Sequence, residues 1–320
     1  MKAIRVLDFG GPEVLKIEEV PDLVPANDEV LVRVHAVGVN PVETYIRSGA
    51  YGNMVTPPYT PGSDAAGIVE SVGANVREYA IGDRVYSDHT VKSAYAEFVV
   101  AKPHQLHRLP DNISCAQGAA LGVPYATAHR ALFGKANAKS GDYVLVHGAS
   151  GAVGIAAVQL ALHHGMKVIA TASTSESRAK LETLGAQYVL DHSDDEHFSD
   201  AHGATCGHGV DVVLEMLANV NLGRDLPILA KNGRVIVIGS RGEATINPRD
   251  IMGRDGQILG MTLFNCPPDE LQSIHAELVE GLGDGWLSPF IHHEYALQEA
   301  PQVHQSVMQN GTWGKIVLIP

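Results

Sequence analysis

Short stretches in which hydrophobic and polar residues alternate occupy the first third of the chain. The clearest is 29–37, which reads EVLVRVHAV, and its period of two predicts a half-buried strand. Glycine and proline separate these stretches, as is typical of tight connections between strands. The predicted strands are 3–7, 29–37, 65–72, 83–86 and 95–100. Strands at this spacing predict a small, partly closed β-barrel.

The pattern changes near Gly118, where helix formers fill 117–133 around a break at 122–124. Buried-type strands then alternate with helical segments. The predicted strands are 143–147, 167–172, 188–191, 210–216, 234–238 and 258–263, and the helices between them include 151–164, 176–184 and 221–230. Six strands that alternate with helices predict a doubly wound parallel sheet. We expect the tail, with helices 269–281 and 297–310 and a strand at 315–319, to return to the first domain.

A glycine-rich turn joins the first predicted strand of this sheet to its helix. Residues 144–154 read VLVHGASGAVG. Gly151 would let the backbone approach a pyrophosphate, Gly154 would let the helix pack tightly on the strand, and the helix N-terminus offers N–H groups to phosphates. Ala149 replaces the first glycine of the usual G-x-G-x-x-G pattern, so the prediction of a dinucleotide site depends on the strand before the turn and the helix after it. The alternative is a purely structural turn.

The end of the second strand of the sheet indicates which dinucleotide binds. Sites for NAD usually place an acid there for the ribose 2′-hydroxyl, but 172–175 reads ASTS. The small hydroxyl side chains leave room and donors for a 2′-phosphate, and Arg178 and His192 follow within reach. This favours NADPH over NADH. For Arg178, a solvated helix face is an equally good interpretation.

Composition and charge narrow the class of protein. The chain has 320 residues, 45% of them hydrophobic and 18% charged, which is typical of a soluble globular protein of about two domains. No apolar run of about 18 residues is present, and the N-terminus is unlike a signal peptide. Three scattered cysteines are typical of reduced cytosolic thiols, so we expect a cytoplasmic protein with no membrane segment. The net charge of −13 disfavours nucleic acid as the main partner.

Several longer segments stand out in addition to the glycine turn, and they are 39–49, 58–64, 144–154, 215–222 and 233–242. With these segments in this order, the chain resembles the zeta-crystallin family of NADPH:quinone oxidoreductases, within the medium-chain dehydrogenases/reductases, over essentially its full length. The resemblance implies a GroES-like, partly open β-barrel domain made of 1–121 and 264–320. It also implies a Rossmann domain of 122–263, with a six-stranded parallel sheet, NADPH in the cleft between the domains, and a homodimer or homotetramer.

The resemblance also implies roles for individual residues. Tyr45 would lie against the nicotinamide, Asn40 and Thr127 beside the reactive ring, and Tyr51 where it gates or binds the acceptor. The resemblance, the glycine turn and the strand ends together give the list of candidate cofactor contacts. They are Tyr45, Ser150, Gly151, Ala152, Val153, Gly154, Ser173, Arg178, His192, Asn221, Ile238, Gly239, Ser240, Arg241, Met261, Thr262 and Leu263.

Each of these assignments has a plainer alternative. Asn221 could be a helix N-cap, Tyr45 and Tyr51 could be surface aromatics, and Thr127 could be a helix residue without a catalytic part. Ser173 stands where many relatives have glycine, so the contacts to the 2′-phosphate stay open.

The ligands of a catalytic zinc are missing. The segments 38–41, which reads GVNP, and 61–64, which reads PGSD, stand where zinc alcohol dehydrogenases carry a Cys and a His-Glu pair. No Cys-x-x-Cys motif is present either, so we expect no metal. An acceptor reduced without a metal must need little activation, which predicts a quinone or another conjugated carbonyl.

Two other functions stay open. NADPH-dependent reduction of the activated C=C bond of an enal or enone needs the same kind of site. An RNA-binding or structural crystallin role is the third alternative. The negative charge and the lack of a basic, aromatic stripe argue against RNA, and the intact glycine turn argues against a purely structural role.

Overall fold

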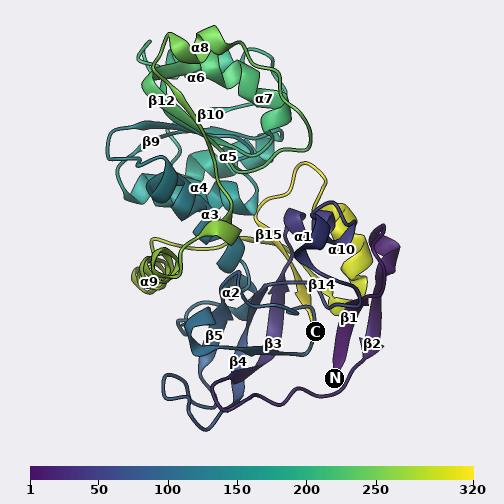
Figure 1. The fold of residues 1–320 in the computed structure, drawn as a ribbon. Coiled ribbons are helices and arrows are strands. Elements are labelled where there is room, and N and C mark those ends of the chain that lie inside the picture. Colours follow the sequence, from purple (N-terminus) through teal and green to yellow (C-terminus); the bar gives the residue numbers. More distant parts are fainter. The chain divides into compact units, whose positions relative to one another are not determined.

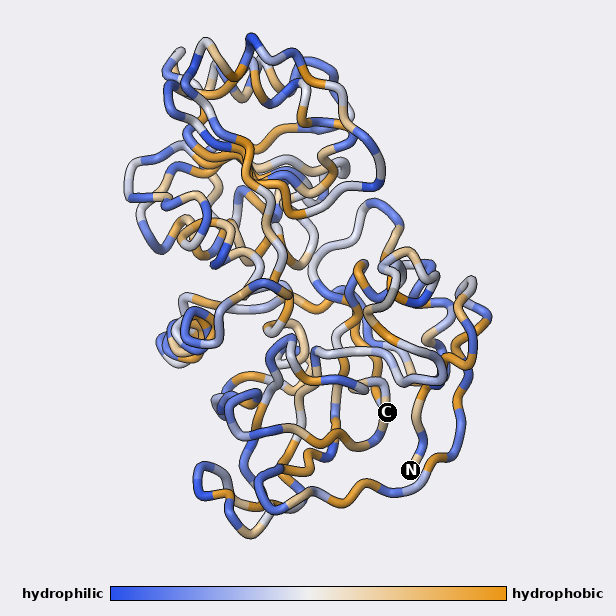
Figure 2. The backbone as a smooth tube through the Cα atoms, viewed as in Figure 1, coloured by the Kyte–Doolittle hydropathy of each residue, from blue (hydrophilic) through white to orange (hydrophobic). Residues whose placement is uncertain are grey.

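The chain divides into two compact units, Met1–Val123 with Leu271–Pro320 and Pro124–Glu270. The computed structural model describes the backbone of residues 1–320 and every side chain except that of Asn53. Figure 2 shows that the hydrophobic segments of each unit gather largely on its strands. Among the described residues, no helix is both long and apolar enough to cross a membrane.

The first unit is built on a curved, mostly antiparallel sheet of seven strands (Figure 1). Its order is β14 (Ile291–Ala296), β15 (Lys315–Ile319), β3 (Val30–Gly38), β4 (Asp64–Val72), β5 (Arg84–Ser87) and β7 (Leu106–Arg108), with β6 (Phe98–Ala101) also paired to β3. A second sheet pairs β1 (Lys2–Val6) with β2 (Leu15–Glu19). This is the predicted GroES-like, partly open barrel, and apolar side chains such as Ile4, Val34 and Val69 fill its core.

The tail returns to the first unit, as predicted. β15 pairs antiparallel with β3, with Leu318 opposite Val37, and β14 runs parallel to β15. The helices of this unit are α1 (Pro41–Arg47), α2 (Cys115–Gly118) and α10 (Ala300–Ser306). Helix α9 (Pro268–Asp284) begins in the second unit and ends in the first.

The second unit is a doubly wound parallel sheet, which confirms the Rossmann prediction. Its order is β10 (Tyr188–Leu190), β9 (Lys167–Thr171), β8 (Tyr143–Val146), β11 (Val210–Glu215), β12 (Leu229–Val237) and β13 (Gln257–Gly260). Figure 1 shows α4 (Ala152–His163) and α5 (Ser175–Leu184) on one face, and α6 (His197–Ala204), α7 (Ala218–Asp225) and α8 (Pro248–Met252) on the other. The order reverses between β8 and β11, and such a switch point is where open α/β sheets bind ligands.

Several predicted boundaries were wrong. The helix predicted over 221–230 ends at Asp225, and β12 begins at Leu229, because Pro227 lacks an N–H and the chain passes through a 3-10 turn. The helix predicted over 297–310 ends at Ser306. The strand predicted over 258–263 ends at Gly260. The break predicted at 122–124 is instead the first turn of α3 (Gly122–His129). Periodicity also missed short elements such as α1, α6, α8, β2 and β14.

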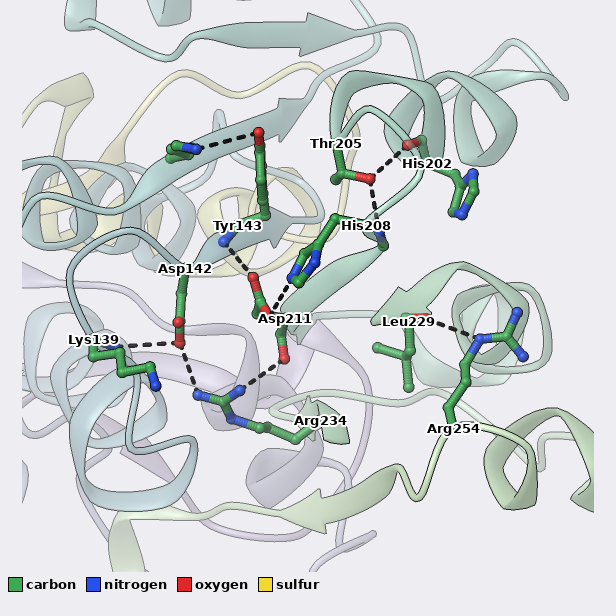
Figure 3. Close-up of polar contacts among 12 residues, drawn as sticks. Lys139, Asp142, Tyr143, His202, Thr205, His208, Asp211, Leu229, Arg234 and Arg254 are labelled. Atoms are coloured by element: carbon green, nitrogen blue, oxygen red, sulfur yellow. Dashed lines mark hydrogen bonds and ion pairs between the residues drawn. The ribbon is translucent and has the colours of Figure 1, made fainter. Parts of the chain in front are cut away.

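Polar side chains secure the amino ends of the central strands of the second unit (Figure 3). The carboxylate of Asp211 accepts a hydrogen bond from the backbone N–H of Tyr143 at 2.8 Å and pairs with His208 Nε2 at 3.1 Å. Arg234 donates to the carboxylate of Asp142 at 2.9 Å and to the carbonyl of Asp211 at 3.2 Å. The amino edge of the sheet is therefore closed by these contacts, whereas the carboxyl edge carries the candidate site.

Candidate cofactor site

The turn between β8 and α4 is held against the neighbouring strand. Gly148 has a φ of +58°, a left-handed conformation that favours glycine. Its N–H donates to Thr171 Oγ1 at 3.2 Å, and the N–H of Ala149 donates to the carbonyl of Thr171 at 2.8 Å. These bonds to the end of β9 fix the path of the turn before any ligand arrives.

The two later glycines of the turn have different surroundings. A Cβ on Gly154 would lie 2.5 Å from the Cα of Ala149 and from the carbonyl oxygen of Gly148, so the close packing expected there is present. A Cβ on Gly151 would meet only the carbonyl oxygen of Gly148, at 3.5 Å. Gly151 is also the N-cap of α4 and makes no side-chain capping bond. The N–H groups of the first turn therefore stay available to an anion.

At the end of β9, Thr174 and Arg178 already form hydrogen bonds within the protein. Thr174 caps α5 by accepting a hydrogen bond from the N–H of Ser177 at 3.1 Å. The guanidinium of Arg178 donates to the carboxylate of Asp191 at 2.7 Å and to the carbonyl of Ser173 at 2.9 Å. Arg178 is half-buried and paired, so it is not a solvated helix face. His192, next to Asp191, is exposed.

A pocket of about 350 Å³ lies at the carboxyl ends of β12 and β13, within the second unit. It brings together five of the predicted contacts, Ile238, Gly239, Ser240, Met261 and Thr262, whereas Arg241 and Leu263 are not among its lining residues. Arg130 and Lys135 also line it, and sequence reasoning missed both.

Arg130 shapes this pocket from a buried position. Its side chain is 4% exposed, and its guanidinium donates to the carbonyls of Thr262 and Asn265, the latter at 2.9 Å, and to the carboxylate of Glu270 at 3.1 Å. It lies in a π-helical segment, Arg130–Lys135, that continues α3, and such segments often occur at functional sites. No local pattern marks Arg130, because its partners lie more than 130 residues away.

Asn221 lies inside α7, whose N-cap is Leu217, so the N-cap interpretation was wrong. Its side-chain amide donates to Glu215 Oε1 at 3.3 Å. The orientation of this amide therefore depends on a buried carboxyl group at the end of β11.

In the first unit, Asn40 is 3% exposed and belongs to a buried polar group. Its amide donates to Asp64 Oδ2 at 2.9 Å, and the ammonium of Lys315 donates to Asn40 Oδ1 at 2.5 Å and to Asp64 Oδ2 at 3.1 Å. Asn40 and Asp64, from the two segments compared with zinc ligands, thus present an amide and a carboxylate that are both bonded to the ammonium of Lys315. Sequence reasoning missed Lys315, because the pairing of β15 with β3 brings it there.

The remaining candidates lie in different units. The rings of Tyr45 and Tyr51 stack in the first unit, with centroids 6.3 Å apart, and Tyr51 is 48% exposed. Thr127 is buried in α3 of the second unit, at 7% exposure.

Comparison with known proteins gives the family. A model described as zinc-binding dehydrogenase matches 152–280, and one described as alcohol dehydrogenase GroES-like domain matches 26–111. Human quinone oxidoreductase is 45% identical over 321 residues, covering 100% of this chain and 98% of the relative. The mouse quinone oxidoreductase is 48% identical over 324 residues, with the same coverage.

The chain belongs to the quinone oxidoreductase family.

Solved structures of quinone oxidoreductases have the same fold. The Escherichia coli quinone oxidoreductase complexed with NADPH superposes with a TM-score of 0.90 at 28% identity, covering all of both chains. The quinone oxidoreductase of Pseudomonas syringae pv. Tomato DC3000 superposes with a TM-score of 0.89 at 32% identity, covering 100% of this chain and 99% of that one. The family assignment and the two-domain fold expected from the sequence are both confirmed.

Proposed function

We propose that this member of the quinone oxidoreductase family oxidises NADPH and reduces quinones without a catalytic zinc. The observation that carries the proposal is the glycine turn at the switch point of the sheet, in a chain that is similar to quinone oxidoreductases over its whole length. The open space at Gly151 and the uncapped first turn of α4 suit a diphosphate.

The second unit would hold the cofactor along the carboxyl edge of its sheet. Ser150 to Gly154 would bind the diphosphate, and Ser173, Arg178 and His192 would bind the 2′-phosphate. NADPH suits this edge because no acid stands at 172–175 to repel a 2′-phosphate. Asn221 and the residues 238–241 and 261–263 would hold the rest of the cofactor. When bound, the dihydronicotinamide supplies the hydride.

The reaction would use polar and aromatic side chains in place of a metal. We assign Tyr45 to the nicotinamide, Asn40 and Thr127 to the neighbourhood of the reacting ring, and Tyr51 to the acceptor. The donor set argues against zinc, because the ammonium of Lys315 already neutralises Asp64 beside Asn40. We also assign 1–121 with 264–320 to the catalytic domain and 122–263 to the NADPH-binding domain.

The decisive experiment measures oxidation of NADPH and of NADH with a panel of quinones and enones, in the presence of a chelator, with an alcohol and NADP⁺ as the control. We expect quinone-dependent, chelator-resistant turnover that prefers NADPH. Turnover with enones but not with quinones would contradict the assigned acceptor, and loss of turnover on chelation would contradict the zinc-free mechanism.

Assembly and location follow the same proposal. We assign a cytoplasmic homodimer or homotetramer that does not depend on nucleic acid, since the charge of −13 repels polyanions. Light scattering coupled to gel filtration should give a mass two or four times the 34.0 kDa of the chain.

A further inference from the structure

Three titratable side chains meet inside the second unit, at the carboxyl ends of β8 and β11. His147 follows β8, Glu215 ends β11 and Asp225 ends α7. Their exposed fractions are 3%, 0% and 0%. His147 Nε2 lies 2.8 Å from Asp225 Oδ1 and 3.7 Å from Glu215 Oε2. We call these residues the buried triad.

The hydrogen bonds of the buried triad are incomplete if both carboxyl groups are ionised. Glu215 Oε1 accepts hydrogen bonds from the N–H of Leu217 and from the amide of Asn221. Glu215 Oε2 and Asp225 Oδ2 are buried and accept none from the described residues. Two adjacent carboxylates in an interior are costly, and a shared proton removes one charge and satisfies one oxygen. One nitrogen or oxygen atom from each of the three side chains lies within 4.8 Å of the other two, so the carboxyl groups that would share the proton are neighbours.

Burial places this proton near neutral pH. Burial raises the pKa of Glu215 to about 7, opposed by the neighbouring His147, and raises the pKa of Asp225 to about 7. Burial also lowers the pKa of His147. The number of protons on the buried triad therefore changes within the physiological range.

Few other charged or titratable groups surround the buried triad. From α6, the ring of His197 lies 6.2 Å from that of His147, and its Nε2 is buried without a hydrogen-bond partner among the described residues. His192 follows β10 and is exposed, and Arg224 lies on the exposed side of α7 over the ring of Phe198. His197, His192 and Arg224 are therefore the neighbouring groups whose protonation or charge bears on proton uptake when an anionic ligand binds.

The buried triad joins the two turns of the switch point. His147 directly precedes Gly148 and the glycine turn. Asp225, at the end of α7, contacts the ring of His147. Glu215 holds the backbone of Leu217 and the side chain of Asn221 in the turn after β11. Both turns contain candidate cofactor contacts.

We propose that His147, Glu215 and Asp225 are positioning residues that hold these two turns through a shared proton, and that the buried triad takes up a proton from solvent when the diphosphate of NADPH binds. This inference rests on the proposed binding of NADPH. A negative charge placed on the adjacent turn favours the protonated form of the buried triad. By linkage, cofactor affinity then falls as pH rises, by up to about tenfold per pH unit where a full proton is taken up.

The test is isothermal titration of the full-length protein with NADPH between pH 6 and 8.5. Each pH is measured in two buffers of different ionisation enthalpy, so that the heat reports the protons taken up. We expect uptake of up to about one proton per NADPH with a maximum near pH 7. Tight binding with no uptake over this range would overturn the inference and leave the proposed function standing. No binding of NADPH at any pH would overturn both.

Variants assign the proton to the buried triad. Glu215→Gln keeps an acceptor oxygen for Leu217 and Asn221 but cannot gain or lose a proton, and Asp225→Asn is its partner variant. Both variants should lose the pH-dependent proton uptake of the buried triad. The proton uptake that remains on NADPH binding should equal the uptake by the 2′-phosphate of NADPH itself. The exposed carboxyl of Glu182 supplies the matched control, and Glu182→Gln should behave as the parent protein.

Two outcomes would reassign the effect. Unchanged uptake in folded Glu215→Gln together with its loss in His192→Gln would place the proton on His192 and overturn the assignment. Elemental analysis of the purified protein tests for a bound metal. One equivalent of a divalent metal that is lost in Glu215→Gln would show that a cation lies where we place the proton. Since wild-type uptake is measured directly, poor folding of a variant does not remove the test.

Discussion

At the residue scale, Gly151 and Gly154, three positions apart, have different structural roles. Gly154 permits contact between α4 and the turn, and Gly151 leaves room on the side where we place a phosphate. A methyl group therefore affects stability at one position and binding at the other.

We predict that Gly154→Ala lowers stability by at least about 1–3 kcal/mol, because its Cβ would overlap backbone atoms that cannot move aside. Gly151→Ala should melt within a few degrees of the parent yet bind NADPH at least about tenfold more weakly. Thermal melting and titration separate the two effects. Gly203→Ala, in exposed α6 with nothing near its Cβ, is the control, and equal behaviour of all three variants would contradict this division of roles.

Glu43 in α1 carries a second residue-scale prediction. Its Oε2 accepts from the N–H of Asn40 at 2.9 Å and from Tyr95 at 2.6 Å, whereas Oε1 is buried without a hydrogen-bond partner among the described side chains. Burial raises the pKa of Glu43 from 4.5 to about 7, against the opposing hydrogen bonds. Because the folded pKa lies above the unfolded one, the carboxyl favours the folded state at low pH, and this advantage is lost between about pH 4.5 and 7.

Glu43→Gln removes this titration and should be more stable than the parent at pH 8, by up to about 3 kcal/mol, with a smaller or reversed difference at pH 5. Denaturant unfolding of both proteins across this range measures it. A stability difference that does not change with pH would refute the raised pKa.

At the element scale, the two edges of the second unit's sheet are built differently. The amino edge is closed by Asp142, Asp211 and Arg234, which bond the strands and loops to one another (Figure 3). The carboxyl edge ends in turns held by backbone bonds and buried side chains, so its N–H groups and pocket stay open to a ligand. Stability and binding can therefore be changed separately.

We predict that Arg234→Met destabilises the protein by about 3 kcal/mol, because Asp142 keeps a buried carboxylate with its partner removed. The NADPH affinity of the folded variant should stay within about twofold of the parent, since the change lies at the opposite edge. Denaturant unfolding and NADPH titration at 20 °C test both statements. A loss of affinity as large as the loss of stability would show that the edges are coupled.

At the scale of the whole molecule, the proposed cofactor is a highly charged anion, whereas the chain itself has a net charge of −13. The attraction must therefore be local, from the N–H groups of α4 and a few cations, and not from the overall field. In the proposed site, the 2′-phosphate would add affinity only at the end of β9, so the choice between NADPH and NADH would depend on that strand end.

We predict that NADPH at about 100 times its Kd stabilises the protein by about 2.7 kcal/mol, which raises the melting temperature by a few degrees. NADH at the same concentration should raise it less, because it lacks the 2′-phosphate. Equal shifts would contradict the preference for NADPH. Arg178→Ala should reduce the difference between the shifts given by the two cofactors, and an unchanged difference would contradict the role assigned to Arg178.

The sequence alone determined the periodic elements and their order. Strands such as 29–37 and 143–147, the helix after the glycine turn, and the stop at Gly185 depend on local patterns and backbone conformations that neighbouring residues encode. The same locality explains the failures near 221–230 and 297–310, where a proline or a turn ended an otherwise helical composition.

Only the tertiary structure decided which distant side chains meet. Arg130 reaches the carbonyls after β13, Lys315 neutralises Asp64, and His147 meets Asp225 across 78 residues of sequence. These groups share no spacing or motif, because their proximity follows from strand order and from the return of the tail. The physical reason is that periodicity records which side of an element is buried, whereas the partner of a buried charge depends on which other elements cover that side.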